Sequence, residues 1–253
     1  MQIEVIIEKK SHKLDAEEGK TILETLQEHG IHVLTAPCGG RGRCGKCTVE
    51  VEHMGEVLAC MTKVTDGMRI TIPKVQLRAQ KSKIAENGTV THYPADDGEG
   101  LDAACDIGTT TVVCHLIDGK TGEKLATVSE PSAQRSFGAD VLSRIQAAEA
   151  GKLEILKEQI IFQIAQMLRT LQKKTGRGEQ IQRLAVVGNT VMCHLFAGIS
   201  PVSIGVTPFM PQEFFGKEYT GEQLGLTDCR SVYIAPAVAG FVGGDITSDL
   251  LAV

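Results

Sequence analysis

The chain has 253 residues, of which 42% are hydrophobic and 23% are charged, and its formal net charge is −5. This composition is that of a globular protein with one large or two modest domains, and it offers no basic face that would argue for nucleic acid. No run of about 18 apolar residues occurs, so no membrane span is predicted. The start, MQIEVIIEKK, does not read as a signal peptide, and the eight cysteines therefore predict thiols or metal ligands in a reducing cytoplasm rather than disulfides.

Residues 1–73 are predicted to form a compact α+β unit. MQIEVIIE (1–8) alternates as a strand does, and SHKLDA (11–16) can pair with it as a hairpin. TILETLQEHG (21–30) has apolar residues at helical spacing and ends at Gly30. The remaining strands are predicted at CTVEVEHMG, GEVLAC and RITIP.

Residues 74–100 are predicted to be a linker, because their periodicity is weak and they change from basic to acidic. After this linker, the order of predicted elements is three strands over 101–131, helices over 138–151 and 153–176, a strand over 183–189 that runs into a helix over 190–199, and a strand over 232–240 before a last segment at 245–253. Strands that alternate with helices predict an α/β layer with a largely parallel sheet.

Ten residues, CGGRGRCGKC (38–47), carry the first candidate site. With a fourth cysteine downstream they give the spacing Cys-x5-Cys-x2-Cys-x12-Cys, formed by Cys38, Cys44, Cys47 and Cys60. An iron–sulfur cluster needs four converging thiolates and a backbone that comes close and bends freely, which Gly39, Gly40, Gly42 and Gly45 allow. The cations Arg41, Arg43 and Lys46 can offset part of the cluster's negative charge. A zinc site and a thioredoxin-type CxxC are the alternatives, although neither explains all four cysteines and all four glycines.

A second candidate site lies in CDIGTTTVV (105–113), where an apolar strand leads to an aspartate, a glycine and three hydroxyls. Such a hairpin can hold a nucleotide phosphate with backbone N–H groups and threonine hydroxyls, while the aspartate faces Mg²⁺. The candidate residues are Asp106, Gly108, Thr109, Thr110 and Thr111. A purely structural turn is the alternative.

These motifs resemble known families. Residues 1 to about 75 look like a β-grasp 2Fe–2S ferredoxin domain, although the five-residue first gap departs from the plant-type spacing and Cys60 follows sooner than in electron-carrier ferredoxins. CDIGTTTVV resembles the first phosphate motif of the ASKHA superfamily (actin, heat-shock chaperones, sugar kinases; RNase H-like). SFGADVLSRI, VVGNTVMCHLFAGI, TPFMP and APAVAGFVGGDI resemble the reductive activators of corrinoid proteins.

The resemblance implies a 2Fe–2S domain at 1–73, a linker at 74–100, and the N-terminal half of an ASKHA ATPase-like domain at 101–253. It implies that the four cysteines hold the cluster and that ATP and Mg²⁺ bind near the phosphate loop and at Gly188, Asn189, Gly243, Gly244 and Asp245. The implied activity is ATP-linked reduction of a Co(II) corrinoid to Co(I). The implied partners are the corrinoid protein of a methyltransferase system and an upstream electron donor, without nucleic acid or membrane.

Two features depart from that family pattern. No second Asp-x-Gly phosphate loop is found, and DLLAV reads as the middle of a helix, so the sequence predicts a fragment of a longer chain, with no independent ATPase activity and with exposed apolar surface. A plain electron-transfer module whose second domain only docks a partner is the alternative function. A sugar-kinase-like phosphotransferase is a further one, for which no catalytic base is recognised.

The remaining cysteines are interpreted as single buried thiols: Cys105, Cys114, Cys193 and Cys229. His194 is interpreted as a core or capping histidine rather than a cleft residue.

Overall fold

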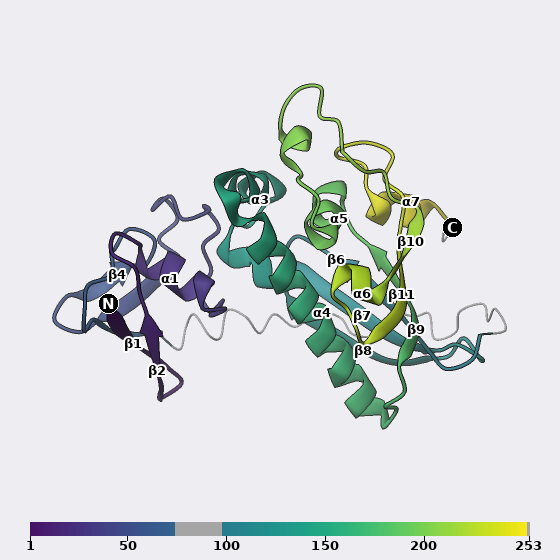
Figure 1. The fold of residues 1–253 in the computed structure, drawn as a ribbon, viewed down its shortest axis with the longest axis horizontal. Helices are drawn as coiled ribbons and strands as arrows, with labels where there is room; N and C mark the ends of the chain where they lie inside the picture. Colours follow the sequence, from purple (N-terminus) through teal and green to yellow (C-terminus); the bar gives the residue numbers. More distant parts are fainter. Residues whose placement is uncertain (74–97, 252–253) are drawn as a thin grey trace. The chain divides into compact units, whose positions relative to one another are not determined.

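The computed structural model of the chain describes residues 1–73 and 98–251 (Figure 1). The chain packs as two compact units, and Ala133–Arg144 belongs to the first unit together with the N-terminal residues. Of the predicted linker at 74–100, all but residues 98–100 lies outside the described residues. The two units are described separately below.

The first unit contains a five-stranded sheet with the order β2-β1-β5-β3-β4. Its strands are β1 (Gln2–Ile7), β2 (Lys10–Asp15), β3 (Thr48–Val51), β4 (Gly55–Leu58) and β5 (Arg69–Thr71). β1 and β5 run parallel, while β1–β2, β3–β4 and β3–β5 are antiparallel pairs. All five strands lie where the sequence predicts them.

The helix of this unit is α1 (Ile22–Glu28). It begins with a capping box, in which the Thr21 side chain accepts from the Glu24 amide and the Glu24 carboxylate accepts from the Thr21 amide, so two otherwise unpaired N–H groups are satisfied. Its apolar residues Ile22 and Leu26 are fully buried in the core formed with the sheet. The helix ends just before Gly30, whose φ is +69°, as the sequence predicts.

The second unit contains a six-stranded sheet with the order β10-β11-β9-β6-β7-β8. Its strands are β6 (Leu101–Ile107), β7 (Thr111–Asp118), β8 (Lys124–Pro131), β9 (Ile181–Val187), β10 (Lys217–Thr220) and β11 (Cys229–Ile234). β6, β9 and β11 are parallel, whereas β7, β8 and β10 are antiparallel to their neighbours. The prediction of a largely parallel sheet is therefore wrong for half of the strands, because the short turns between β6, β7 and β8 can join only antiparallel neighbours.

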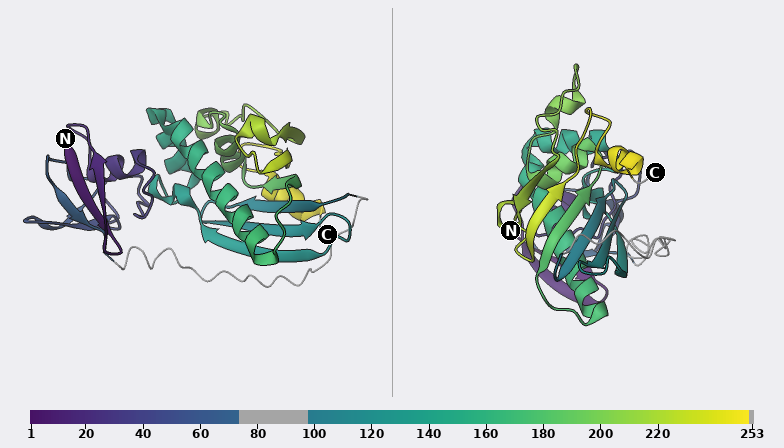
Figure 2. Two further views of the ribbon diagram at one scale, coloured as in Figure 1. Left: turned by 60° about the horizontal axis from the view of Figure 1, so that its bottom comes forward. Right: turned by 90° about the vertical axis from the view of Figure 1, so that its right-hand side faces the viewer.

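The helical elements after β8 are η1 (Ala133–Ser136), α3 (Val141–Ala147), the π-helical η2 (Ala148–Lys152), α4 (Leu153–Thr175), α5 (Thr190–Ala197), η3 (Val202–Gly205), α6 (Gly221–Leu224) and α7 (Gly244–Leu251). Gly151, with φ +83°, separates α3 from α4. α4 crosses β7 and β8 and also packs against α5 (Figure 2). The sequence analysis predicts neither β10 nor α6. In the described part of the chain, no helix has both the length and the apolar content needed to cross a membrane.

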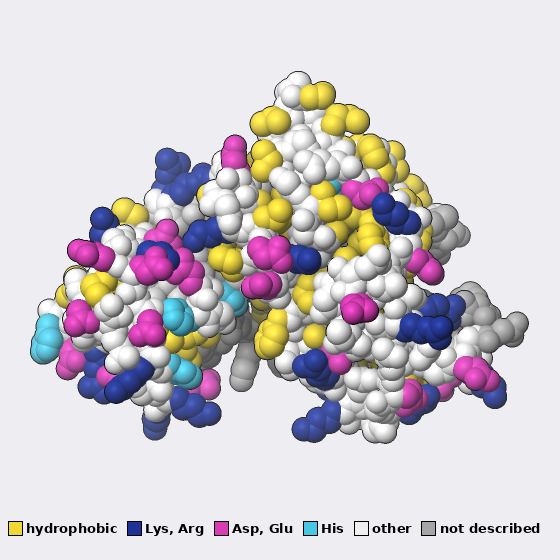
Figure 3. All heavy atoms as spheres, in the orientation of Figure 1, with side chains coloured by type: hydrophobic (Ala, Val, Ile, Leu, Met, Phe, Trp, Pro, Cys, Tyr) yellow, Lys and Arg dark blue, Asp and Glu magenta, His cyan; other side chains and the backbone are white. Residues whose placement is uncertain are grey.

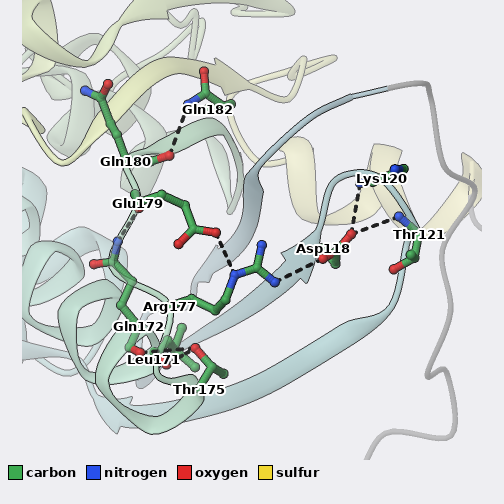
Figure 4. A network of polar contacts seen from close by, with 10 residues as sticks. All are labelled: Asp118, Lys120, Thr121, Leu171, Gln172, Thr175, Arg177, Glu179, Gln180 and Gln182. Carbon is green, nitrogen blue, oxygen red and sulfur yellow. Dashed lines mark hydrogen bonds and ion pairs between the residues drawn. The ribbon is translucent and has the colours of Figure 1, made fainter.

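A polar network closes the end of this sheet where β6 and β9 begin (Figure 4). Arg177, just after α4, pairs with Asp118 at the end of β7 at 3.1 Å and with Glu179 at 2.6 Å. Asp118 also accepts hydrogen bonds from the amides of Lys120 and Thr121 at 3.1 and 3.0 Å. These bonds, those to Thr121 and Arg177 foremost, lower the pKa of Asp118. The network joins the end of α4 to the β7–β8 turn. Its residues therefore all lie at this end of the sheet and not at the end where β6 and β9 finish.

Candidate functional site

The cysteine loop lies between α1 and β3, and Cys60 follows β4, so two adjacent strands direct all four cysteines to one end of the sheet. The sulfurs lie as two pairs. The Cys47 Sγ donates to the Cys60 Sγ at 3.3 Å. Cys38 and Cys44 form the other pair, because their thiols are hydrogen-bonded to each other.

The loop backbone uses its glycines as the sequence predicts. Gly39, Gly40, Gly42 and Gly45 have φ values of +63°, +81°, +71° and +64°. Residues with a Cβ rarely adopt this left-handed region, so the path of the loop depends on glycine at these places.

Backbone amides surround the sulfur of Cys38. Burial alone raises the pKa of this thiol, but hydrogen bonds from the Cys44 amide and thiol and from the Arg43 and Arg41 amides lower its pKa to about 6. The pKa of Cys60 is raised to about 12, first by burial and then by the neighbouring Cys47 thiol. The loop thus offers N–H groups to a thiolate, which is the environment that an anionic sulfur cluster requires.

The arrangement of the four cysteines can be compared with what a single metal ion and a 2Fe–2S cluster each require. Within residues 1–73 and 98–251 there is no group of three or more His, Cys, Asp or Glu side chains gathered for one ion. A 2Fe–2S cluster held by four thiolates takes two of them on each iron. Two sulfur pairs, with amides around them, fit that demand.

A distant segment completes the first unit beside this loop. The Gln27 side chain of α1 donates to the Ser136 carbonyl at 2.8 Å, and the Ala139 amide donates to the Pro37 carbonyl at 3.3 Å. Arg144 of the same segment is fully buried. The sequence analysis places this segment only in a helix of the second domain and gives no sign of its contact with residues 27 and 37.

His32, before the cysteine loop, faces the same segment, with its ring 6.4 Å from the ring of Phe137. Burial lowers the pKa of His32 to about 4. The imidazole is therefore neutral at physiological pH.

The second candidate site gathers at the end of the six-stranded sheet where β6 and β9 end. Asp106 is the second-last residue of β6, and Thr109 lies in the β6–β7 turn. The Asn189 side chain, which caps α5, donates to the Thr109 hydroxyl at 3.0 Å. The carboxyl ends of parallel strands are the usual place for ligand sites in α/β sheets.

The third predicted stretch joins the same place. Gly243 and Gly244 lie at the start of α7, and the Asp245 amide donates to the Gly188 carbonyl at 3.2 Å. The structure thus brings together all three stretches that the sequence analysis singles out, namely 106–111, 188–189 and 243–245. Thr110 lies in the same turn and is exposed, and Thr111 is the first residue of β7.

Three glycines make this convergence possible for steric reasons. A Cβ on Gly188 would lie 2.6 Å from the Ile107 Cγ1. A Cβ on Gly243 would collide with the Thr190 amide, and one on Gly108 would collide with the Thr111 carbonyl. At these three positions the neighbouring segments come too close to leave room for a Cβ, so only glycine fits.

Two further acidic residues act on Asp106 at this edge, although the three carboxylates do not form a metal-binding group among the residues that the structure describes. Asp106 is exposed to solvent, yet the surrounding protein and then the charges of Asp245 and Asp249 raise its pKa to about 6. A cation at this place would relieve the repulsion between these carboxylates. The sequence analysis does not name Asp249, although its spacing of four residues from Asp245 on a predicted helix is a usable signal.

The other cysteines are not all single. Cys105 and Cys114 face each other directly across β6 and β7, with their sulfurs 2.7 Å apart, and both are buried. Both are buried free thiols, as the sequence analysis interprets them, but they are not isolated, because antiparallel pairing places them opposite each other. Cys193 and Cys229 are buried free thiols.

His194 is a core residue, as the sequence analysis favours. Its side chain is fully buried, its Nδ1 lies 2.7 Å from the Thr190 carbonyl, and its Nε2 accepts from the Glu213 amide at 3.3 Å. Its ring also packs edge-on against Phe215. Both ring nitrogens are therefore used within the fold.

Hydrophobic side chains gather over the loops that follow α5 and β11 (Figure 3). Phe209 and Phe241, from separate loops, pack edge to face with ring centroids 5.8 Å apart, and both are exposed. The other exposed large apolar residues of these loops and of α7 are Val206, Met210, Phe214, Val238, Val242, Ile246 and Leu250. We call these nine residues the apolar face. Their presence agrees with the predicted exposed apolar surface.

Comparison with known families gives two matches. The family model described as the RACo middle region matches residues 101–253. The model described as a 2Fe-2S iron-sulfur cluster binding domain matches residues 4–74.

Two relatives carry both parts. The corrinoid activation enzyme RamQ of Eubacterium limosum is 27% identical, and the match covers 86% of this chain and 50% of RamQ. A solved structure of a reductive activator for a corrinoid, iron–sulfur protein is 25% identical with a TM-score of 0.58, and the match covers 98% of this chain and 57% of that one. The chain thus spans about half the length of these two relatives.

Proposed function

This chain belongs to the family of reductive activators of corrinoid proteins, and from that membership we propose that it donates electrons to a corrinoid protein in a process coupled to ATP. The electron would convert an inactive Co(II) corrinoid to Co(I). The corrinoid protein would belong to a methyltransferase system in the cytoplasm, and an upstream donor would supply the electrons. The paired sulfurs of the cysteine loop are the observation that carries this proposal.

The first unit is the proposed electron donor. We assign the ligands of a 2Fe–2S cluster to Cys38, Cys44, Cys47 and Cys60. When bound, such a cluster supplies one electron at a time. The amides of Arg41, Arg43 and Cys44 would stabilise thiolate at Cys38, and the buried Cys47–Cys60 pair would keep water from the other side.

The second unit is proposed to be the first lobe of an ASKHA, RNase H-like nucleotide domain. The support is its topology: a three-strand antiparallel meander, β6 to β8, extends through β9 to β11 with β6, β9 and β11 parallel. The β6–β7 turn with Thr109 and Thr110, and Thr111 at the start of β7, then lie at the carboxyl edge of the parallel strands.

The residues at this edge have distinct proposed roles. The backbone of the β6–β7 turn and the hydroxyls of Thr109, Thr110 and Thr111 would bind phosphate oxygens. Asp106 would face Mg²⁺; the support is its place at this edge and the neighbouring charges of Asp245 and Asp249, which act together with burial to raise its pKa. Asn189 positions Thr109, and Gly188, Gly243 and Gly244 let the three backbones meet.

The apolar face supports a two-lobe arrangement. Monomeric proteins rarely expose large contiguous apolar patches, and the relatives contain about as much chain again as this one. The relatives have a part that this chain does not span. We propose that the apolar face packs against a segment equivalent to that part. That part would also supply the second phosphate loop.

The experiment is a stopped-flow measurement of corrinoid reduction. The chain, loaded with iron and sulfide and reduced with dithionite, is mixed with a Co(II) corrinoid protein under anaerobic conditions, with and without MgATP. We expect Co(I) to form, with the rate depending on the cluster, and Cys44→Ser to abolish it. No Co(I) from a fully loaded and reduced chain would contradict the proposed electron donation.

Nucleotide binding separates this function from the plain electron-transfer module. We expect the chain to bind MgATP weakly by calorimetry, and Asp106→Asn to weaken that binding. Cluster-dependent reduction of the corrinoid without any nucleotide affinity would favour the plain module, whose second domain only docks a partner.

A further inference from the structure

We propose that the cysteine loop and Met61 form a docking surface for the acidic face of an electron-exchange protein. We define the basic rim as Arg41, Arg43 and Lys46 with Met61 beside them. The proposal rests on the proposed electron-transfer function, and it adds the chemistry of the partner and the residues that bind it.

The charge of the loop is one-sided and turned outward. Residues 38–47 contain three basic residues and no acidic one, in a chain whose formal net charge is −5. All three basic side chains are exposed. An acidic protein would be repelled by much of this chain and attracted here, which favours one orientation of approach.

The two arginines are not used inside the fold. Two other basic side chains of the first unit have carboxylate partners, Lys20 in Glu17 and Glu28 and Arg69 in Glu4. For residues 1–73 and 98–251, no ion pair involves the side chain of Arg41 or Arg43. Their guanidinium groups are therefore available to carboxylates of another molecule, which they can bind in a bidentate manner.

The backbone of the same residues faces the sulfurs. The amides of Arg41 and Arg43 hydrogen-bond to Cys38, and the Gly42 amide hydrogen-bonds to Cys60. A protein that touches these arginine side chains thus lies against the stretch of backbone that holds both sulfur pairs. Short distance between redox centres is the main requirement of an electron-transfer contact, so this is the best-placed surface of the unit.

Met61 adds an exposed apolar side chain beside the three cations. It directly follows Cys60, and 62% of it is exposed. It also lies against Gly42, where a Cβ would be 2.8 Å from the Met61 sulfur. A flexible thioether next to exposed charges suits a small, transient interface, which is the class to which electron-transfer contacts belong.

A rival role for these cations is to offset the charge of the cluster and set its potential. The two roles predict different kinetics with small redox complexes of opposite charge. In the test, the reduced chain gives one electron to ferricyanide, an anion whose iron goes from Fe(III) to Fe(II), or to hexaammineruthenium, a cation whose metal goes from Ru(III) to Ru(II). Docking on a basic surface favours the anion, whereas a changed potential alters both rates in the same direction.

The variants are R41Q/R43Q and, as a charge-matched control, K10Q/K13Q, whose two lysines are exposed on β2 at the opposite edge of the sheet from β3 and β4. We expect R41Q/R43Q to slow oxidation by ferricyanide about tenfold at low salt and to speed oxidation by hexaammineruthenium, and K10Q/K13Q to change neither. Equal effects of the two variants, or a change of both rates in one direction, would overturn the proposal.

A binding measurement tests the docking surface without relying on electron transfer. A fluorescent hexaglutamate peptide is titrated with the cluster-loaded chain at low ionic strength and followed by anisotropy. We expect binding by the wild type and by K10Q/K13Q, with at least about tenfold weaker binding by R41Q/R43Q. Equally weak binding by all three would overturn the proposal.

If R41Q/R43Q fails to take up iron, the salt dependence of the wild-type rates still tests the proposal. Its rate with ferricyanide must fall with added salt, and its rate with hexaammineruthenium must not. The opposite dependence would overturn the docking surface even if the chain reduces a corrinoid protein. Failure to reduce a corrinoid protein, together with the expected charge selectivity, would instead remove the proposed function and leave a basic electron-exchange surface.

Discussion

The two candidate sites of this chain are built in opposite ways. The cysteine loop collects its four sulfurs from residues 38–60, and one turn-rich stretch with two neighbouring strands is enough to form it. The proposed nucleotide site, which we call the nucleotide edge, collects its residues from 106–111, 188–189 and 243–249, which are brought together only when the whole six-stranded sheet is formed. A local site tolerates changes elsewhere in the chain, whereas a site of distant parts depends on every contact that aligns them.

The largest effect should come from a cluster ligand. Cys47→Ser should remove nearly all bound iron, because the buried Cys47–Cys60 pair would lose one thiolate. Iron content and visible absorption are the measurements. The matched control is Cys229→Ser, which replaces another buried free thiol and should leave iron content unchanged. Equal iron in both variants would break the assignment.

A smaller effect should come from a glycine at the nucleotide edge. Gly243→Ala places a Cβ against the Thr190 amide and 2.6 Å from Asn189, which should cost about 1–3 kcal/mol of folding free energy in the second unit. Denaturant unfolding measures it. Gly178→Ala is the control, since its Cβ meets nothing within 4 Å. The cluster spectrum of Gly243→Ala should match the wild type. Loss of the cluster would show that the two sites are not independent.

A still smaller effect should come from Asp106. Asp106→Asn should weaken Mg²⁺-dependent nucleotide binding about tenfold, because one charge that faces the cation is removed, while metal-free nucleotide should bind no worse. Calorimetry with and without Mg²⁺ separates the two. Glu218→Gln, on the exposed strand β10, is a control of equal charge change. Equal losses with and without Mg²⁺ would argue against a cation at Asp106.

The smallest effect concerns pH in the first unit. The pKa of His32 is lowered from 6.5 to about 4 in the folded chain, so the unfolded state binds the extra proton first as pH falls. The contribution of His32 is therefore fully present above pH 6.5 and is lost progressively towards pH 4. Thermal unfolding between pH 7 and pH 4 should show a steeper loss of stability for the wild type than for His32→Leu. Parallel curves would contradict a buried neutral imidazole.

The sequence predicts the local features well and the long-range ones poorly. The cysteine spacing, the flexible glycines of the loop and the helix that ends at Gly30 are all features of short stretches, and the structure bears out the fold that they suggest. The antiparallel half of the second sheet and the Cys105–Cys114 contact depend on strand pairing, which no single stretch reveals. The contact of Ser136 with Gln27 joins residues 109 positions apart and leaves no periodic signal.

At the nucleotide edge the sequence identifies most residues through motif, but not their neighbour Asp249. That residue matters because the charges of Asp245 and Asp249 both act on Asp106, an effect of tertiary packing. A motif identifies only the residues that belong to its pattern. A residue such as Asp249, which tertiary packing brings close to the site, is found only from the structure.

The central claim is that four cysteines of the first unit hold one 2Fe–2S cluster that gives up single electrons. The most direct measurement is the iron, zinc and acid-labile sulfide content of the anaerobically reconstituted chain, together with its electron paramagnetic resonance after dithionite reduction. Our account predicts about two iron and two sulfide per chain and one unpaired spin after reduction, all lost in Cys44→Ser. A single metal ion per chain without labile sulfide, or a loaded chain that stays silent after reduction, would contradict it.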